Sequence, residues 1–139
     1  KQTGEKSFLL KSRDFYRQAF EAFPKDYYTG INAASKSLLA GEKETAAQLA
    51  ERVQKVVGDK AVSGDYWKTA TAAEVQLLQG KIEAAGALYQ SAVTIAPLEY
   101  GSHESTHDQA KLLLQALGAS DEQRALIASA FLTGKSAGK

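Results

Sequence analysis

The sequence predicts an all-α fold, a stack of antiparallel helical hairpins with about seven helices in a single domain over residues 1–139. Apolar residues recur at helical spacings throughout the chain, and no segment alternates in the way a strand does. The connections between these segments are short, which favours antiparallel neighbours. The chain also repeats itself, because Asp26-Tyr27-Tyr28 returns as Asp65-Tyr66-Trp67. A period of about 20–50 residues is typical of repeat architectures, which usually present a binding surface.

The repeat is clearest over residues 26–49, where ten of 24 positions are identical to their counterparts in 65–88. Asp26 is suited to cap a helix at its N-terminus, and Gly41 is suited to end that helix in a left-handed conformation. The same two residue types return at Asp65 and Gly80. We therefore expect one hairpin over residues 26–57 and a second over residues 65–97.

A half repeat is expected before these hairpins and a degenerate repeat after them. Residues 7–24 predict the second helix of a repeat whose first helix is missing, and this helix ends at Pro24. It carries an apolar stripe of Phe8, Phe15, Ala19 and Phe23. Residues 103–132 predict the degenerate copy, in which Ser120 and Gln123 match a capping box. The chain begins at Lys1 and contains no methionine, so we expect a fragment of a longer protein or a processed form.

Alanines stand where two helices of the stack would touch. Small side chains let helix axes approach to the closer end of the usual range of about 8–10 Å. These alanines are Ala33, Ala34, Ala46, Ala72, Ala73 and Ala85.

Composition narrows the classes of function. The net charge of +1 argues against a nucleic-acid module, which would normally have a strongly basic face. No run approaches the roughly 18 apolar residues that span a bilayer, so no membrane partner is expected. The absence of cysteine excludes disulfides, thiolate metal sites and a cysteine nucleophile, and it fits a cytoplasmic protein. We expect no cofactor.

Residues 66–97 resemble a tetratricopeptide repeat. With Tyr66 as the first position, the family's small residue, turn, packing alanines, aromatic residue and terminal proline correspond to Ala73, Gly80, Ala85, Tyr89, Ala92 and Pro97. The chain departs from that family in three respects, of which the first is Ala50 in place of the aromatic residue expected in the first copy. Its period, from Asp26 to Asp65, is longer than the family's roughly 34 residues, and Trp67 stands at position 2 of its copy instead of position 4.

Two segments resemble a narrower family, the TRAFs-binding domain, known from the apoptosis signal-regulating kinases and from bacterial repeat proteins. They are Tyr27-Tyr28-x-Gly30-Ile31-Asn32-Ala33-Ala34 and Asp65-Tyr66-Trp67-x-x-Ala70-Thr71-x-x-Glu74. The resemblance covers roughly residues 15–118. It implies a tetratricopeptide-like α-solenoid that works as a regulatory scaffold and binds another protein, with no catalytic activity.

The first helices of the two hairpins carry the predicted partner-binding residues, because such helices line the concave face of repeat stacks. Aromatic side chains with a polar tip are favoured anchors at interfaces. The candidates are Tyr28, Asn32, Ser35, Trp67, Thr71 and Glu74.

An alternative interpretation places some of these side chains in the core. We favour the core position for Tyr27 and Tyr66, whereas for Tyr28 and Trp67 both interpretations stay open. Asn32 could equally form a hydrogen bond to the adjacent repeat.

The segment His103-Glu104-Ser105-Thr106-His107 matches the H-E-x-x-H motif of zinc hydrolases. Histidines four residues apart share a helix face and can both reach a zinc ion, with the glutamate as general base. A third ligand is needed, and only Asp121 or Glu122 is a conceivable candidate downstream. The motif also falls at the polar start of a repeat helix. We therefore expect no catalytic residues, and His103 and His107 stay a candidate pair for adventitious zinc or nickel.

The predicted function is a protein–protein interaction module, not an enzyme, that docks a segment of another protein or a peptide on its concave face. Two alternatives stay open: a zinc-dependent hydrolase using His103, Glu104 and His107, and a structural module that self-associates through its exposed end helices as a homo-oligomer.

Overall fold

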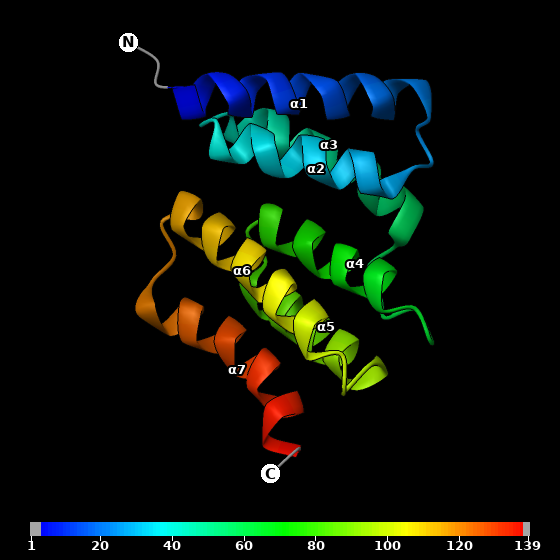
Figure 1. Cartoon of the computed structure of the whole chain (residues 1–139), viewed down its shortest axis with the longest axis vertical. Coiled ribbons are helices and arrows are strands. Elements are labelled where there is room, and N and C mark those ends of the chain that lie inside the picture. The colour runs from blue at the N-terminus through cyan, green and yellow to red at the C-terminus, as the bar shows by residue number, and fades with distance from the viewer. Residues whose placement is uncertain (1–3, 138–139) are drawn as a thin grey trace.

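The structure is a computed structural model that describes the backbone of residues 4–137 and the side chains of residues 4–132. Within residues 4–137 the chain forms seven helices and no strands, which confirms the predicted all-α stack of hairpins (Figure 1). The helices are α1 (Gly4–Ala22), α2 (Tyr27–Leu39), α3 (Lys43–Val57), α4 (Tyr66–Leu78), α5 (Ile82–Ile95), α6 (Tyr100–Leu117) and α7 (Asp121–Ala137).

The sequence period is also a structural period. The offset that relates Asp26 to Asp65 also relates both ends of α2 to both ends of α4, and the start of α3 to the start of α5. The Asp26 carboxylate accepts hydrogen bonds from the first-turn N–H groups of α2, and Asp65 does the same for α4. Gly41 and Gly80 follow these helices with φ angles of 89° and 80°, a region that glycine enters without strain. The same caps therefore build both hairpins.

The core lies between the helices of each hairpin and between consecutive hairpins. All six alanines predicted at helix contacts are buried. The largest buried side chains include Tyr89 and Leu77 in the second hairpin and Phe20 beside the first. Because small and large residues interdigitate across these contacts, α2 packs against α3 and α4 against α5 along most of their lengths.

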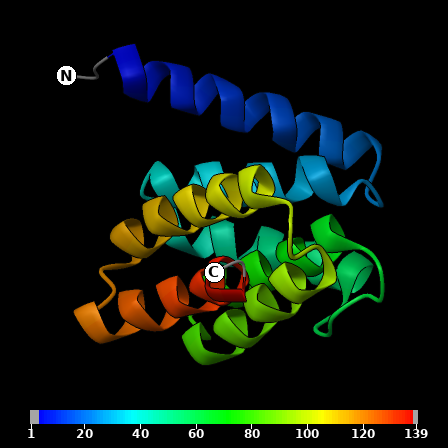
Figure 2. The ribbon, with the colours of Figure 1, turned by 60° about the horizontal axis from the view of Figure 1, so that its bottom comes forward.

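The third hairpin departs from the stack. Helix α7, rather than α6, makes the main contact with α5, whereas α6 lies against α2, α4 and α7. A Cβ atom on Gly86 of α5 would lie 2.6 Å from Cδ2 of Leu126, so this glycine lets α7 approach closely. The expectation that consecutive helices are always neighbours is therefore wrong for α5 and α6. Figures 1 and 2 show α1 at the opposite end of the stack from α7.

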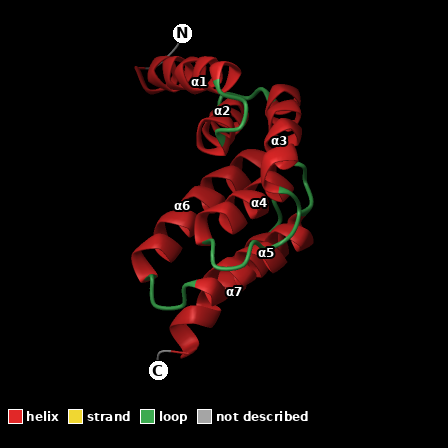
Figure 3. Cartoon of the chain, turned by 90° about the vertical axis from the view of Figure 1, so that its right-hand side faces the viewer, coloured by secondary structure: helices red, strands yellow, loops and turns green. Residues whose placement is uncertain are grey.

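Seen from the side, α2 and α6 lie on one side of the stack, and α3 and α5 lie on the other (Figure 3). Because α6 contacts both α2 and α4, it covers part of the face that the first helices of the two hairpins share.

Helix α1 packs through a different side chain from those of the predicted stripe. Phe20 is only 1% exposed, whereas Phe8, Phe15 and Phe23 are 74%, 67% and 70% exposed. The three phenylalanines of the expected stripe therefore face solvent, and only its fourth residue, Ala19, is half-buried. Gly30 of α2 explains why Phe20 is the residue of α1 that packs inward. A Cβ atom on residue 30 would lie 2.7 Å from the Phe20 ring, so only glycine leaves room for the ring.

We expect Gly30→Ala to lower the free energy of unfolding by about 1–3 kcal/mol, because the new methyl group overpacks against buried Phe20 and Val53. Chemical denaturation measures the change. Gly101→Ala in α6 is the control, because a Cβ atom there meets nothing within 4 Å. Equal stability of the two variants would contradict the close approach of α1 to α2.

Candidate functional site

A groove with a volume of about 230 Å³ lies between α2, α4 and α6, and we call it the central groove. Five of the six predicted partner-binding residues line it, in two rows along adjacent helices. The lining comprises Tyr28, Ile31 and Asn32 from α2, Trp67, Ala70, Thr71 and Glu74 from α4, and Ser105, Thr106 and Gln109 from α6. The structure thus brings together residues that the sequence could place only on separate helices.

Ser35, the sixth predicted residue, is buried and does not line the groove. Its hydroxyl donates a hydrogen bond to Oε2 of Glu74. The two residues are 39 positions apart, so equivalent positions of the two repeats are bonded to each other. Ser35 therefore holds Glu74 in place instead of contacting a ligand.

Glu74 forms the polar floor of the central groove. Burial raises the pKa of this carboxyl above its usual range, while hydrogen bonds from Ser35 and Gln109 and the charge of Lys36 act in the opposite direction. No salt bridge pairs Glu74 with a cation among residues 4–132, whose side chains are described. The groove therefore contains a carboxyl group that is held by neutral donors.

Tyr28 and Trp67 form the rim of the groove from equivalent positions of the two repeats. They are 60% and 53% exposed, so neither side chain lies in the core. The Tyr28 ring meets Tyr16 edge-on at 6.0 Å, and the Trp67 ring meets Tyr66 edge-on at 5.0 Å. Each rim side chain is thus supported by a more buried tyrosine, so part of its orientation is fixed before a partner binds.

Tyr66 belongs to the core, as predicted, and joins α4 to α6. Its ring is buried, and its hydroxyl makes a 2.9 Å hydrogen bond with the Thr106 hydroxyl and donates to the Ser102 carbonyl at 3.2 Å. Asn32 donates from Nδ2 to the Tyr28 carbonyl at 2.8 Å, a bond within α2. The alternative for Asn32, a bond to the adjacent repeat, is thus replaced by a bond along its own helix.

Sequence reasoning missed the contribution of α6 to the groove. Ser105 and Thr106 are the two free positions of the H-E-x-x-H match, and Gln109 lies one turn further along the helix. The polar residues at the start of α6 could have indicated a contribution to a binding surface. The sequence could not show that α6 lies beside α2 and α4, because that placement depends on where α7 docks.

The two histidines of the motif take part in packing. His103 is buried, and its Nε2 donates to the Ala96 carbonyl at 2.8 Å, because a carbonyl oxygen can only accept. The His107 ring stacks on Phe131 at 4.7 Å between centroids. In the part of the chain that the structure describes, no group of three His, Asp or Glu side chains is placed to hold a metal ion.

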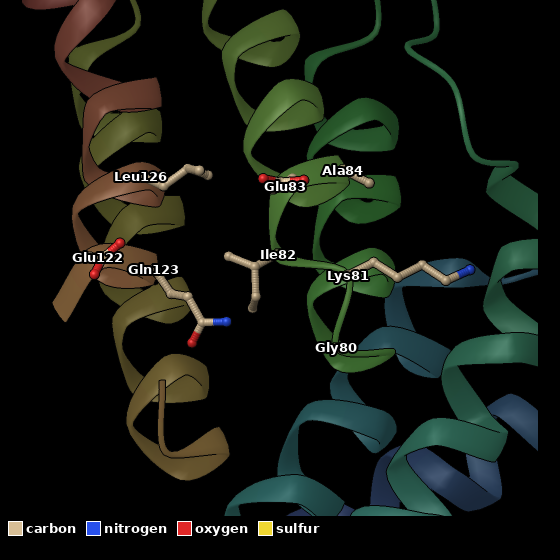
Figure 4. A pocket seen from close by; sticks show the side chains of 8 residues that line it. All are labelled: Gly80, Lys81, Ile82, Glu83, Ala84, Glu122, Gln123 and Leu126. Atoms are coloured by element: carbon tan, nitrogen blue, oxygen red, sulfur yellow. The ribbon is translucent and has the colours of Figure 1, made fainter. Parts of the chain in front are cut away.

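A larger hollow of about 630 Å³ lies between the starts of α5 and α7. Ile82, Gln123 and Leu126 point toward it, whereas Lys81 and Glu122 extend away from it (Figure 4). It contains none of the predicted partner-binding residues and no buried charged group. The central groove is therefore the better candidate site.

Comparison of the chain with family models, with curated proteins and with solved structures finds no match. The resemblance to tetratricopeptide repeats and to the TRAFs-binding domain stays a prediction from the residues. Over the described residues, none of the helices combines the length and apolar character needed to cross a bilayer.

The raised pKa of Glu74 predicts a pH-dependent stability. The folded state holds this proton more tightly than the unfolded state, so the contribution is full below the ordinary value of 4.5 and is lost as pH rises through the folded-state pKa. Glu74→Gln stays neutral at every pH. We therefore expect the wild type to lose stability relative to Glu74→Gln as pH rises above 4.5.

Thermal unfolding of both proteins from about pH 4 to about pH 8 measures this difference. Glu83→Gln, at an exposed carboxylate on α5, controls for the loss of one negative charge. A stability difference between wild type and Glu74→Gln that is constant across this range would contradict the raised pKa of Glu74.

Proposed function

We propose that the chain is a protein–protein interaction module that docks a segment of a partner in the central groove. The observation that carries this proposal is the pair of exposed aromatic side chains, Tyr28 and Trp67, at equivalent positions on the rim of one groove. Exposed aromatic anchors beside polar groups are typical of binding hot spots.

The frame around the groove supports this proposal. Helices α2 and α4 are joined by the bond between Ser35 and Glu74, and α4 and α6 by the bond between Tyr66 and Thr106. A groove formed by packed helices loses little conformational freedom on binding. A partner segment would therefore meet a groove whose shape is already formed.

The size of the groove favours a peptide segment as the occupant. Small-molecule sites usually measure about 300–1,000 Å³ and enclose most of their ligand. The central groove, at about 230 Å³, is smaller and opens between two exposed aromatic residues. It suits one side chain of a partner, with the rest of the segment lying across Tyr28 and Trp67.

Selection of displayed random peptides against the purified chain tests this proposal. We expect the enriched peptides to bind Trp67→Ala at least about 10-fold more weakly than the wild type, because Trp67 is one of the two aromatic anchors of the groove. Leu98→Ala, at an apolar residue outside the groove that is even more exposed than Trp67, should bind them unchanged. Failure to enrich any peptide, or equal binding by wild type and Trp67→Ala, would overturn the proposal.

One observation favours self-association as a second candidate function. Helix α1 and the residue that follows it carry three exposed phenylalanines, Phe8, Phe15 and Phe23, whereas the end helix of a repeat stack normally presents a polar face. Phe8 lies seven residues before Phe15, and Phe23 lies eight residues after it. A two-fold axis near Phe15 would therefore place the segment around Phe8 of one copy beside the segment around Phe23 of an antiparallel second copy, as an isologous contact requires.

The exposed area of these three phenylalanines is large enough to form the centre of a dimer interface. Aromatic side chains bury about 150–250 Å² each, so three that are about 70% exposed supply roughly 320–530 Å² per copy. The total surface buried by two copies approaches the lower limit of about 1,200 Å² for stable interfaces once the residues of α1 that flank the phenylalanines are included. We therefore infer that the occupant of this face is a second copy of the chain.

Light scattering during size-exclusion chromatography measures the mass in solution. We expect a wild-type mass approaching that of two chains with rising concentration, and a mass of one chain for Phe15→Glu, because the charge would be buried at the two-fold axis. Leu98→Glu is the control and should behave as the wild type. A wild-type mass of one chain at the highest soluble concentration would contradict the inferred dimer.

A further inference from the structure

We infer that the central groove receives a basic side chain of the partner segment, arginine in preference to lysine, with Glu74 as the group that binds its charge. This inference rests on the proposed function and adds the chemistry of the partner. Glu74 is the only formally charged residue among those that line the groove. The fixed charge that a ligand meets there is therefore negative.

Glu74 has bonding capacity left for such a ligand. Its carboxyl group accepts hydrogen bonds from Ser35 and Gln109, and an ionised carboxylate offers about four acceptor sites. Lys36, the cation that acts on it, does not form a salt bridge with it among the described side chains. The Lys36 ammonium group lies over the Tyr16 ring at 5.8 Å. The half-buried Glu74 carboxylate is thus not ion-paired within the described side chains, and a partner can supply the countercharge.

The aromatic rim selects the same kind of side chain. Trp67 and Glu74 lie seven residues apart on one face of α4, about 10 Å along the helix axis. A long unbranched side chain can enter beside Trp67, lay its apolar stem along Thr71 and bring its charged end to Glu74. A cation close to the faces of tryptophan and tyrosine gains further attraction from the rings.

Arginine fits these features better than lysine. Its planar guanidinium group stacks on aromatic faces, pairs with a carboxylate through two parallel hydrogen bonds and is less strongly hydrated than an ammonium group. The neutral acceptors Asn32 and Ser105 also lie in the lining and can receive its remaining N–H groups. An acidic or apolar side chain would leave the charge of Glu74 unpaired in the groove.

The fluorescence of Trp67 reports on the groove directly, because this residue is the only tryptophan in the chain. The probes are acetylated and amidated pentapeptides, four alanines around a central arginine, lysine, citrulline or glutamate. We expect the Trp67 emission to respond most strongly to arginine, then to lysine. Citrulline, the neutral isostere of arginine, should bind at least about 10-fold more weakly because it lacks the charge-assisted pair with Glu74. Glutamate should not bind.

Glu74→Gln should bind the arginine and citrulline peptides about equally, since the loss of the carboxylate removes the charge preference and keeps the shape. Glu83→Gln changes the net charge by the same amount outside the groove and should keep the wild-type preference. Circular dichroism checks that both variants keep their helices. Persistence of the arginine preference in Glu74→Gln would overturn the inference, as would a flat titration of the wild type with the arginine peptide.

The failure of this inference is distinguishable from failure of the proposed function. If the displayed peptides bind through Trp67 but show no enrichment of arginine or lysine, the interaction module stands and the basic side chain is rejected. If no peptide depends on Trp67, both are rejected.

Discussion

The close approach of α7 to α5 is the contact on which the candidate site depends. Gly86 has no side chain where Leu126 packs, so α7 occupies the surface of α5 that the next repeat would otherwise cover. Helix α6 is then placed against α2 and α4. The bond of Tyr66 to Thr106 fixes it there, and Gln109 reaches Glu74 from the same helix. Without this arrangement the two rows of predicted residues would form an open concave face rather than a three-sided groove.

The sequence predicts the parts of this fold that depend on local or repeated features. The caps at Asp26 and Asp65 act on their own helices, so the sequence alone locates both hairpins. Helical periodicity, in contrast, locates an apolar face on α1 without saying whether it turns inward. Phe20 is buried because Gly30 leaves room for its ring, a contact between helices that no pattern within α1 contains. The position of α6 escapes prediction for the same reason, since it follows from the contact between Gly86 and Leu126.

The candidate site shows the same division between local pattern and tertiary contact. The register of the repeat identifies Tyr28 and Trp67 as equivalent residues, and both are exposed in the structure. It also identifies Ser35 and Glu74 as equivalent, but the pattern of a single helix cannot show that these side chains meet. The two repeats have thus diverged at this position into a donor and an acceptor. One of the six predicted residues therefore supports the site from below, and five face the groove.

The presence of a carboxyl group at this point needs a physical reason beyond packing. A neutral amide at position 74 could accept the Ser35 hydrogen bond without the desolvation that raises the pKa of Glu74. Ionisable groups with perturbed pKa values, which lower the stability of the free protein, are found preferentially at functional sites. The alanines beside it in the sequence, Ala72 and Ala73, are fully buried, whereas Glu74 lines the groove. A ligand that supplies a positive charge would remove the desolvation penalty on binding, so the same residue that weakens the free protein would strengthen the complex.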